Sequence, residues 1–552
     1  MRAQADAELK EKINANLSEH LSLMSSQFPS KPAFLHPDRI TYRELEQEVN
    51  RYAHGLKQIG IGRNTRTILL VTPRLEFFIL TFALFHIGAV PVMIDPGMGA
   101  KAMAKSLAGV EAEAFVGSHK AHLLRFLYPG AFRTVKICLT LGRRWFWSRY
   151  GLSDLQSDRE DSCPPCFLNP EDSAAILFTS GSTGPSKGVI YRTSMMNSQI
   201  AILRSHFKFR PEEIDLCTFP LIGLFSLCLG LTIVLADMDM THPASLDPKK
   251  IIANIQDNGC TQMFCSPMVL DRLARYGNES NTRLSSLKRV ITAGAPVSNQ
   301  LLHSFKRLLV PEAEIYVPYG ATEALPVTKI SANELIQLSR EDYEWDKCIC
   351  LGYPLKETDV RIIAITDEPI LLWDDAQQLP PNQVGEIVVK GQIVSDGYLN
   401  MPEADAIAKI KDSRNDGVWH RTGDLAQMDS SGRLWFFGRK SQRVITSDGT
   451  LFTIPCEFIF NQHPRVFRSA LVGVPIGVTG QIKPVLCVQM EPDDPGGNQQ
   501  KLVQELLAMG AANPQTRCIR EILFPGQFPV DPRHNAKIFR EKLTLWAARR
   551  IK

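Results

Sequence analysis

Short apolar runs rich in β-branched residues alternate with helical patterns from the start of the chain to about residue 330. Such runs predict buried parallel strands, because a strand that helices cover on both faces is apolar throughout rather than at alternate positions. This alternation predicts an α/β fold, with parallel or mixed sheets and flanking helices. The predicted strands are residues 67–72, 89–94, 174–178, 262–265, 289–292 and 314–317.

Two longer apolar runs, residues 77–94 and 221–236, raise the question of membrane-spanning helices. The first run contains His86, Gly88 and Pro91, and the second is shorter than the ~20 residues that a spanning helix needs. We therefore predict a buried helix, or a helix followed by a strand, in both places.

The pattern changes near residue 350. Residues 359–365 and 385–390 alternate between apolar and polar positions, which predicts half-exposed antiparallel strands. A further set of strand and helix patterns begins near Gly438. We expect an N-terminal domain at 1–438, β-rich from about 350, and a small α+β C-terminal domain at 439–552.

Composition narrows the class of protein. The chain has 552 residues, of which 44% are hydrophobic and 22% charged, so it is neither disordered nor fibrous. The net charge of +4 is small for this length, whereas nucleic-acid binding is usually marked by a concentrated basic patch, so we expect no nucleic-acid partner. Small-molecule substrates are the expected partners.

Twelve cysteines are scattered along the chain rather than spaced as a disulfide framework. Neither close pair, Cys163 with Cys166 or Cys348 with Cys350, has the further ligands that a structural zinc site needs. The charged N-terminal segment lacks the apolar core of a secretory signal. We expect a cytoplasmic protein with reduced thiols.

Glycines, hydroxyl residues and one lysine crowd the segment that directly follows the predicted strand at 174–178. Glycine lets backbone N–H groups approach an anion, hydroxyls add donors, and lysine adds a positive charge. A flexible linker rarely follows a buried strand directly, so we interpret the segment as a phosphate-binding loop, although the Walker A spacing is not met. Its candidate residues are Thr179, Ser180, Gly181, Ser182, Thr183, Gly184 and Lys187.

This loop resembles the signature loop of the adenylate-forming superfamily, which includes the acyl-CoA synthetases. The resemblance covers about residues 20–545 and implies an enzyme that uses ATP and Mg²⁺ to convert a carboxylic acid into an acyl-adenylate. The superfamily's other motifs follow in order at residues 293–296, 319–323, 385–391, 419–424, 438–439 and 533–540.

The resemblance assigns the nucleoside-binding residues. Gly294 and Ala295 would border the adenine, and Tyr319, followed by Gly320, would stack on its ring. An aromatic ring offers a stacking face for a purine. Asp424 would accept hydrogen bonds from both ribose hydroxyls, a role that suits a carboxylate with two oxygens.

The resemblance also assigns the residues that act on the phosphates. Thr322 would contact the α-phosphate, Glu323 would bind Mg²⁺, and Arg439 would contact ribose or phosphate. Lys537 would catalyse adenylate formation, because developing negative charge needs a positioned cation. The expected catalytic set is Lys537, Glu323, Thr322 and Lys187.

A hinge between the two domains is implied at Ser441, two residues after Arg439. The superfamily usually has Asp or Lys at this position, so the serine departs from the pattern. Pro455-Cys-Glu457 resembles the superfamily's Pro-x-Glu motif, which begins a helix.

Less widely shared segments, among them residues 218–225, 318–326 and 530–537, resemble the olefin-biosynthesis β-lactone synthetases. Many acyl-CoA synthetases have a histidine near the carboxylate pocket where this chain has Gly223. We expect Gly223 to open space for an α-alkyl branch of the substrate.

The implied reaction has two stages. A 2-alkyl-3-hydroxy fatty acid and Mg-ATP give an acyl-adenylate, and the substrate's own 3-hydroxyl then closes a β-lactone and expels AMP. His420 and His534 are candidate general bases because they lie within motifs. Two alternatives remain open: an acyl-CoA synthetase that uses CoA, and a non-catalytic adenylate-binding module.

Residues 142–147, with Arg149, are basic and aromatic. This composition is typical of a membrane interface or of a surface for a partner enzyme of the same pathway. It is equally typical of a helix edge with buried tryptophans, and we favour this second interpretation.

Overall fold

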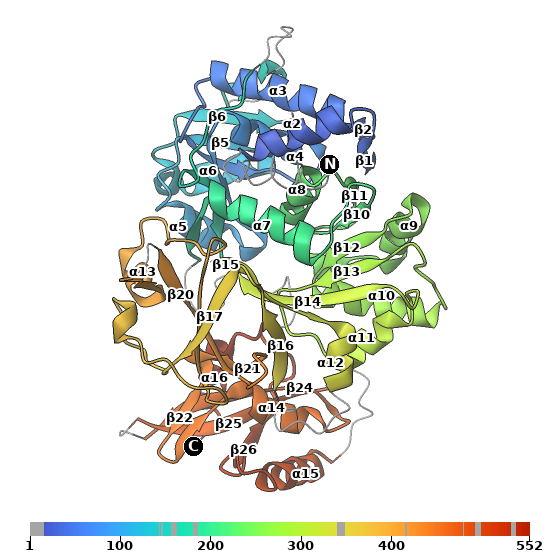
Figure 1. Ribbon diagram of the computed structural model, residues 1–552. Helices are drawn as coiled ribbons and strands as arrows, with labels where there is room; N and C mark the ends of the chain where they lie inside the picture. Colours follow the sequence, from blue (N-terminus) through green and yellow to red (C-terminus); the bar gives the residue numbers. More distant parts are fainter. Residues whose placement is uncertain are drawn as a thin grey trace.

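The computed structural model describes residues 16–142, 144, 147–155, 163–179, 186–338, 348–414, 417–477, 480–491, 498–530 and 537–551. In Figure 1 the chain runs from the blue N-terminal part at the top, through the green and yellow middle, to the orange and red part at the bottom.

A seven-stranded sheet forms part of the upper half, in the order β7-β6-β5-β3-β4-β8-β9. Neighbouring strands are parallel except for β8 and β9, which pair antiparallel. The parallel pairs confirm the α/β prediction. The strands are β3 (Arg66–Leu70), β4 (Val90–Met93), β5 (Ala114–Ser118), β6 (Ile137–Leu141), β7 (Tyr150–Gly151), β8 (Ser173–Phe178) and β9 (Gly188–Arg192).

The largest sheet runs through the middle of the molecule in the order β17-β18-β20-β21-β16-β15-β14-β13-β12-β10-β11-β1-β2, with β19 paired to β20. Neighbouring strands are parallel in the part of the sheet that runs from β1 through β11, β10, β12 and β13 to β14. They are antiparallel in the part that runs from β14 through β15, β16, β21, β20 and β18 to β17. The antiparallel part confirms the prediction for the region after residue 350.

The strands of this sheet, in chain order, are β1 (Pro32–His36), β2 (Ile40–Thr41), β10 (Ile214–Cys217), β11 (Thr232–Leu235), β12 (Gln262–Cys265), β13 (Arg289–Thr292), β14 (Glu314–Ala321), β15 (Ala324–Ser331), β16 (Ile349–Pro354), β17 (Thr358–Ile363), β18 (Gly385–Gly391), β19 (Lys409–Lys411), β20 (Val418–Met428) and β21 (Leu434–Arg439).

The helices before residue 410 flank these sheets or pack between them, as Figure 1 shows for α2, α4, α7 and α8. They are α2 (Leu17–Gln27), α3 (Tyr42–Gln58), α4 (Leu75–His86), α5 (Ala100–Leu107), α6 (His119–Leu127), α7 (Thr193–His206), α8 (Pro220–Cys228), α9 (Pro248–Asn258), α10 (Pro267–Glu279), α11 (Asn299–Lys306), α12 (Ala332–Leu338) and α13 (Pro402–Ala408).

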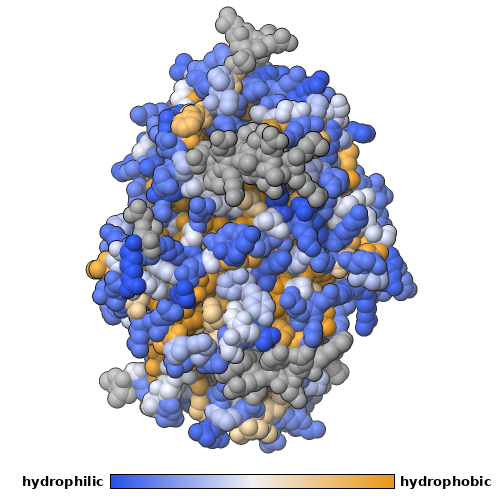
Figure 2. Space-filling view, in the orientation of Figure 1, coloured by the Kyte–Doolittle hydropathy of each residue, from blue (hydrophilic) through white to orange (hydrophobic). Residues whose placement is uncertain are grey.

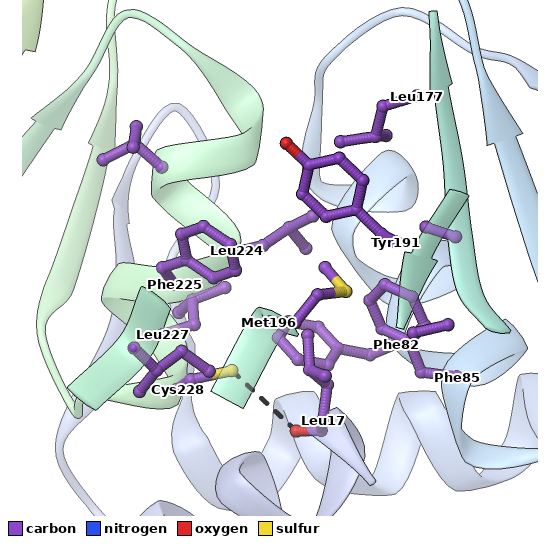
Figure 3. Close-up of a cluster of buried hydrophobic side chains, with 14 of the residues drawn as sticks. Leu17, Phe82, Phe85, Leu177, Tyr191, Met196, Leu224, Phe225, Leu227 and Cys228 are labelled. Carbon is purple, nitrogen blue, oxygen red and sulfur yellow. Dashed lines mark hydrogen bonds between the residues drawn. The ribbon is translucent and has the colours of Figure 1, made fainter. Parts of the chain in front are cut away.

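The main hydrophobic core joins the two large sheets through α2, α4, α7 and α8. Figure 3 shows Leu17, Phe82, Met196 and Leu224 from these four helices in one cluster that also includes Leu177 of β8. Each residue of α4 from Phe77 to His86 is buried, because the helix is covered on all sides. The two long apolar runs are therefore helix-then-strand pairs, α4–β4 and α8–β11, as predicted.

Residues 444–551 form sheets of their own. One contains β22 (Val444–Thr446) and β23 (Gly449–Leu451), and the other contains β24 (Val466–Ile476), β25 (Gln481–Met490) and β26 (Glu521–Leu523). Helices α14 (Thr453–Asn461) and α16 (Arg540–Ala548) pack against β24, and α15 (Gln499–Ala511) packs against α14. Two hydrophobic clusters draw only on this part of the chain.

Within the described part of the chain, none of the helices combines the length and the apolar character needed to cross a membrane. Figure 2 shows a largely hydrophilic face with hydrophobic residues visible between the blue ones across the middle of the view. Residues 143, 145 and 146 of the basic and aromatic segment lie outside the described residues.

Candidate active site

A cavity of about 2470 Å³ lies where the two large sheets and the C-terminal residues meet. Its lining includes Thr218 and Ala293, which directly follow the parallel strands β10 and β13. Ligands of α/β proteins bind at the carboxyl ends of parallel strands, where the following loops diverge. The fold therefore places the cavity where a substrate site is expected.

The cavity brings together most of the residues that the sequence analysis singled out. Ser180 to Gly184 and His534 lie outside the described residues. The predicted residues that line the cavity are Thr179, Lys187, Gly294, Ala295, Tyr319, Gly320, Thr322, Glu323, His420, Asp424, Arg439, Ser441 and Lys537.

Asp424 of β20 is held by two neighbours in the cavity wall. The Tyr319 hydroxyl donates to Asp424 Oδ2 at 2.7 Å, and Arg439 Nε lies 2.9 Å from Oδ1. Burial raises the pKa of Asp424, while Arg439, the Tyr319 hydrogen bond and Lys537 act in the opposite direction. Oδ1 is buried without an aligned hydrogen bond among the described atoms, so it can accept one from a ligand hydroxyl.

Glu323 is a second carboxylate in the cavity wall. Its Oε1 accepts a hydrogen bond of 2.7 Å from the Tyr398 hydroxyl. Lys187 Nζ lies 4.6 Å from the centre of the Tyr398 ring, within the range of a cation–π contact. Burial and the Glu323 charge raise the pKa of Tyr398, so the tyrosine stays a neutral donor.

Tyr398 therefore links Glu323 to Lys187. The donor chemistry fits Mg²⁺, which proteins hold through one or two carboxylates together with substrate phosphates. Glu323 supplies such a carboxylate in the cavity wall.

The two ends of the predicted phosphate-binding loop are fixed to each other. The Thr179 backbone N–H donates to Lys187 O at 3.0 Å, and the Lys187 N–H donates to Thr179 Oγ1 at 3.1 Å. These bonds continue the antiparallel pairing of β8 with β9. The loop therefore begins and ends beside the cavity.

Lys537 reaches the cavity from the C-terminal part of the chain and lies near enough to Asp424 to lower its pKa. The residues after it are anchored by Arg540, whose guanidinium binds both carboxylate oxygens of Glu457 at 2.5 and 2.9 Å. Glu457 belongs to the Pro-x-Glu motif, which lies in α14 as predicted.

Ser441 lies in a 3-10 turn, Lys440–Gln442, between two differently anchored neighbours. Lys440 Nζ donates to Glu386 Oε2 of β18 at 3.0 Å, and Arg421 binds the same oxygen at 2.6 Å. Gln442 Oε1 instead accepts from Arg540 Nε at 3.2 Å. The side chains on either side of Ser441 are thus tied to different parts of the molecule.

The expectation for Gly223 is wrong. Its neighbours Pro220, Leu221 and Ile222 line the cavity, but Gly223 does not. A Cβ atom at this position would meet Cys217 Sγ at 2.7 Å and the Phe78 ring at 3.0 Å. The glycine permits close packing of α8 on β10 and α4, and it opens no space for substrate.

His420 is buried, and its Nδ1 lies 3.2 Å from Ala408 O. Burial, assisted by Lys409, holds the pKa of His420 well below its usual range. A histidine with such a low proton affinity is a weak general base at neutral pH. The structure gives no support to the role expected for it.

Gln199 of α7 also lines the cavity, although it belongs to none of the sequence motifs. Its spacing in the sequence could have pointed to it, because Gln199, Leu203 and Phe207 are four residues apart, as on one face of a helix. Leu203 and Phe207 line the cavity as well.

Residues 24–399 of the chain match the family described as AMP-binding enzyme. Two curated relatives are named olefin β-lactone synthetase. The protein from Xanthomonas campestris pv. campestris is 42% identical over 92% of this chain and 91% of its own length. The protein from Stenotrophomonas maltophilia is 43% identical over the same shares.

More distant matches include 2-succinylbenzoate–CoA ligase of Bacillus licheniformis, 24% identical over 84% of this chain and 88% of its own. Among solved structures, the amide bond synthetase McbA from Marinactinospora thermotolerans superposes with a TM-score of 0.78 at 22% identity. The match covers 96% of this chain and 99% of that one. At this identity the likeness shows the fold alone.

Proposed function

Because the chain belongs to the AMP-binding enzyme family and is an AMP-forming synthetase, we propose that its product is a β-lactone. Its substrate would be a 2-alkyl-3-hydroxy fatty acid. The observation that carries this proposal is the 42–43% identity to two olefin β-lactone synthetases over 92% of the chain. The CoA ligase from Bacillus licheniformis is only 24% identical.

In the first half-reaction, a carboxylate oxygen of the acid bonds to the α-phosphorus of ATP and pyrophosphate leaves. Lys537 stabilises the negative charge that develops between the two substrates. Asp424 and Arg439 hold the ribose, Tyr319 stacks on the adenine, and Thr322 contacts the α-phosphate. Glu323 would hold Mg²⁺ together with the phosphates, and the ion would supply charge that neutralises them.

In the second half-reaction, the 3-hydroxyl oxygen bonds to the acyl carbon and closes a four-membered ring. The bond between that carbon and the phosphate oxygen breaks, its electron pair leaves with AMP, and the hydroxyl proton passes to the departing phosphate. Both reacting groups belong to one bound molecule, so no second substrate is needed.

The apolar side of the cavity supports a hydrophobic acid. Carbon-rich side chains of α7, α8 and the strands beside them would exclude water from the reactive adenylate. Those that line the cavity include Leu203, Phe207, Leu221, Ile222, Phe225, Leu235, Met238 and Phe264.

The test compares a 2-alkyl-3-hydroxy fatty acid with the matched acid that lacks the hydroxyl, each with ATP and Mg²⁺, with and without CoA. The hydroxy acid should give AMP and a β-lactone by mass spectrometry without CoA, and the simple acid should stop as a bound adenylate. Efficient CoA-dependent turnover of the simple acid would replace this proposal with an acyl-CoA synthetase.

A further inference from the structure

Gln199 is a polar side chain on an otherwise apolar wall of the cavity. It lies on α7, Leu203 follows one helical turn later and Phe207 comes directly after the helix, and all three line the cavity. Gln199 is only 2% exposed. A buried amide at such a position lowers stability unless its polar atoms find partners.

Only one end of the Gln199 amide has partners among the described residues. Nε2 donates to the carbonyl oxygen of Leu325 at 3.0 Å. The amide also lies close enough to Tyr191 to lower the pKa of its hydroxyl, although burial raises that pKa more strongly. Oε1 is buried without a hydrogen bond from any described residue. Exchanging the two amide atoms would place the oxygen against the Leu325 carbonyl, so this orientation is the favourable one.

The amide lies at the boundary between the polar and apolar sides of the cavity. Tyr191, which Gln199 contacts, donates its hydroxyl to the carbonyl oxygen of Thr322 at 2.6 Å. Figure 3 shows the Tyr191 hydroxyl at the edge of the apolar cluster. Gln199 thus reaches Leu325 directly and Thr322 through Tyr191, and it is in line with the apolar side chains of Leu203 and Phe207.

We propose that Gln199 Oε1 accepts a hydrogen bond from the 3-hydroxyl of the bound acyl-adenylate and so selects hydroxylated acids. This inference rests on the proposed function. On an alkyl acyl chain the hydroxyl is the one group that can donate to a buried acceptor. An amide oxygen is too weak a base to remove the proton, so Gln199 orients the hydroxyl beside the acyl carbon.

The test uses Gln199→Met, which keeps the length of the side chain and removes both polar atoms. Pyrophosphate exchange is measured with the 3-hydroxy acid and with the matched acid without the hydroxyl, and the ratio of kcat/KM values is compared. Loss of one hydrogen bond should lower this ratio by about tenfold. Exchange with the simple acid reports folding, and Gln199→Leu serves as a second variant if Gln199→Met is unstable.

Tyr191→Phe is the matched control, because it removes the neighbouring bond to Thr322 and keeps the Gln199 acceptor. It should change exchange with both acids alike. An unchanged ratio in Gln199→Met, in an enzyme whose wild type makes the lactone, would overturn this inference alone. A wild type that makes no lactone would overturn the proposed function instead.

Discussion

At the scale of single residues, the cavity keeps charged groups buried by giving each a close partner. Asp424 lies 2.9 Å from Arg439, and Glu323 accepts from Tyr398 at 2.7 Å. Lys537 comes from the C-terminal part of the chain, lines the same cavity and acts on the pKa of Asp424. The proposed roles therefore divide into nucleotide binding by Asp424 and charge stabilisation by Lys537.

We expect Lys537→Ala and Asp424→Ala to fail in different ways. Lys537→Ala should slow adenylate formation by roughly 100-fold to 1,000-fold, as loss of a positioned charge costs about 3–4 kcal/mol, with little change in ATP affinity. Asp424→Ala should weaken ATP binding by at least about tenfold through the lost ribose hydrogen bonds. Pyrophosphate exchange and equilibrium ATP titration measure the two effects.

Lys542→Ala is the control for Lys537→Ala, because Lys542 is an exposed lysine of α16 a few residues later. It should leave exchange unchanged. Mild and equal effects of the Lys537 and Asp424 substitutions on both measurements would show that the site has been assigned to the wrong residues.

Motif residues could be predicted from the sequence because their types carry the chemistry, whereas the packing of Gly223 could not. Its role depends on what a Cβ atom at this position would meet, and those neighbours, Cys217 and Phe78, come from other segments of the chain. The link between Tyr398 and Glu323 joins residues 75 positions apart and likewise appears only in the fold.

At the scale of helices and strands, apolar runs predicted the elements well because buried parallel strands are apolar on both faces. Their order could not be predicted, since β1 pairs with β11 about 200 residues later in the chain. Burial of whole elements also encloses polar residues such as Asp215 of β10. The Ser226 hydroxyl of α8 donates to its Oδ2 at 2.8 Å.

The buried carboxyl of Asp215 should make the free energy of unfolding depend on pH. Burial raises its pKa to about 6, above the value of about 3.9 expected in the unfolded chain. The native state is therefore favoured while Asp215 is protonated, and this contribution is lost as the pH rises through about 6. At pH 8, Asp215→Asn should unfold at a higher urea concentration than wild type. Its free energy of unfolding should be greater by up to about 3 kcal/mol.

The advantage of Asp215→Asn should shrink by about half at pH 5, where the native carboxyl is mostly protonated. Urea unfolding curves at the two pH values measure this difference. A variant that is less stable than wild type by the same amount at both pH values would show that burial of the charge is not the dominant effect.

At the scale of the whole molecule, the C-terminal residues have sheets and clusters of their own yet deliver Lys537 to the cavity. We propose that they form a domain, beginning at about residue 439, that rotates about Ser441 between the half-reactions. The differently anchored neighbours Lys440 and Gln442 support this position. The Arg443–Asp367 ion pair, at 2.5 Å, would have to part during the rotation.

Ser441→Pro would fix one backbone torsion at this position. We expect it to impair one half-reaction at least about tenfold more than the other, because each half-reaction would need a different domain orientation. Pyrophosphate exchange reports the first half, and AMP release from a preformed adenylate reports the second. Ser441→Ala, which leaves the torsions unrestricted, should be nearly normal; equal rates for Ser441→Pro in both halves would argue against a hinge here.

The central claim, closure of the lactone by the substrate's own hydroxyl, is tested most directly with an acid that carries ¹⁸O at both carboxylate oxygens. Turnover with ATP and Mg²⁺, without CoA, should give AMP with one ¹⁸O and a β-lactone with one ¹⁸O in its carbonyl. The ring oxygen, which comes from the hydroxyl, should be unlabelled. Unlabelled AMP, or AMP formation from the hydroxy acid that requires CoA, would contradict the account.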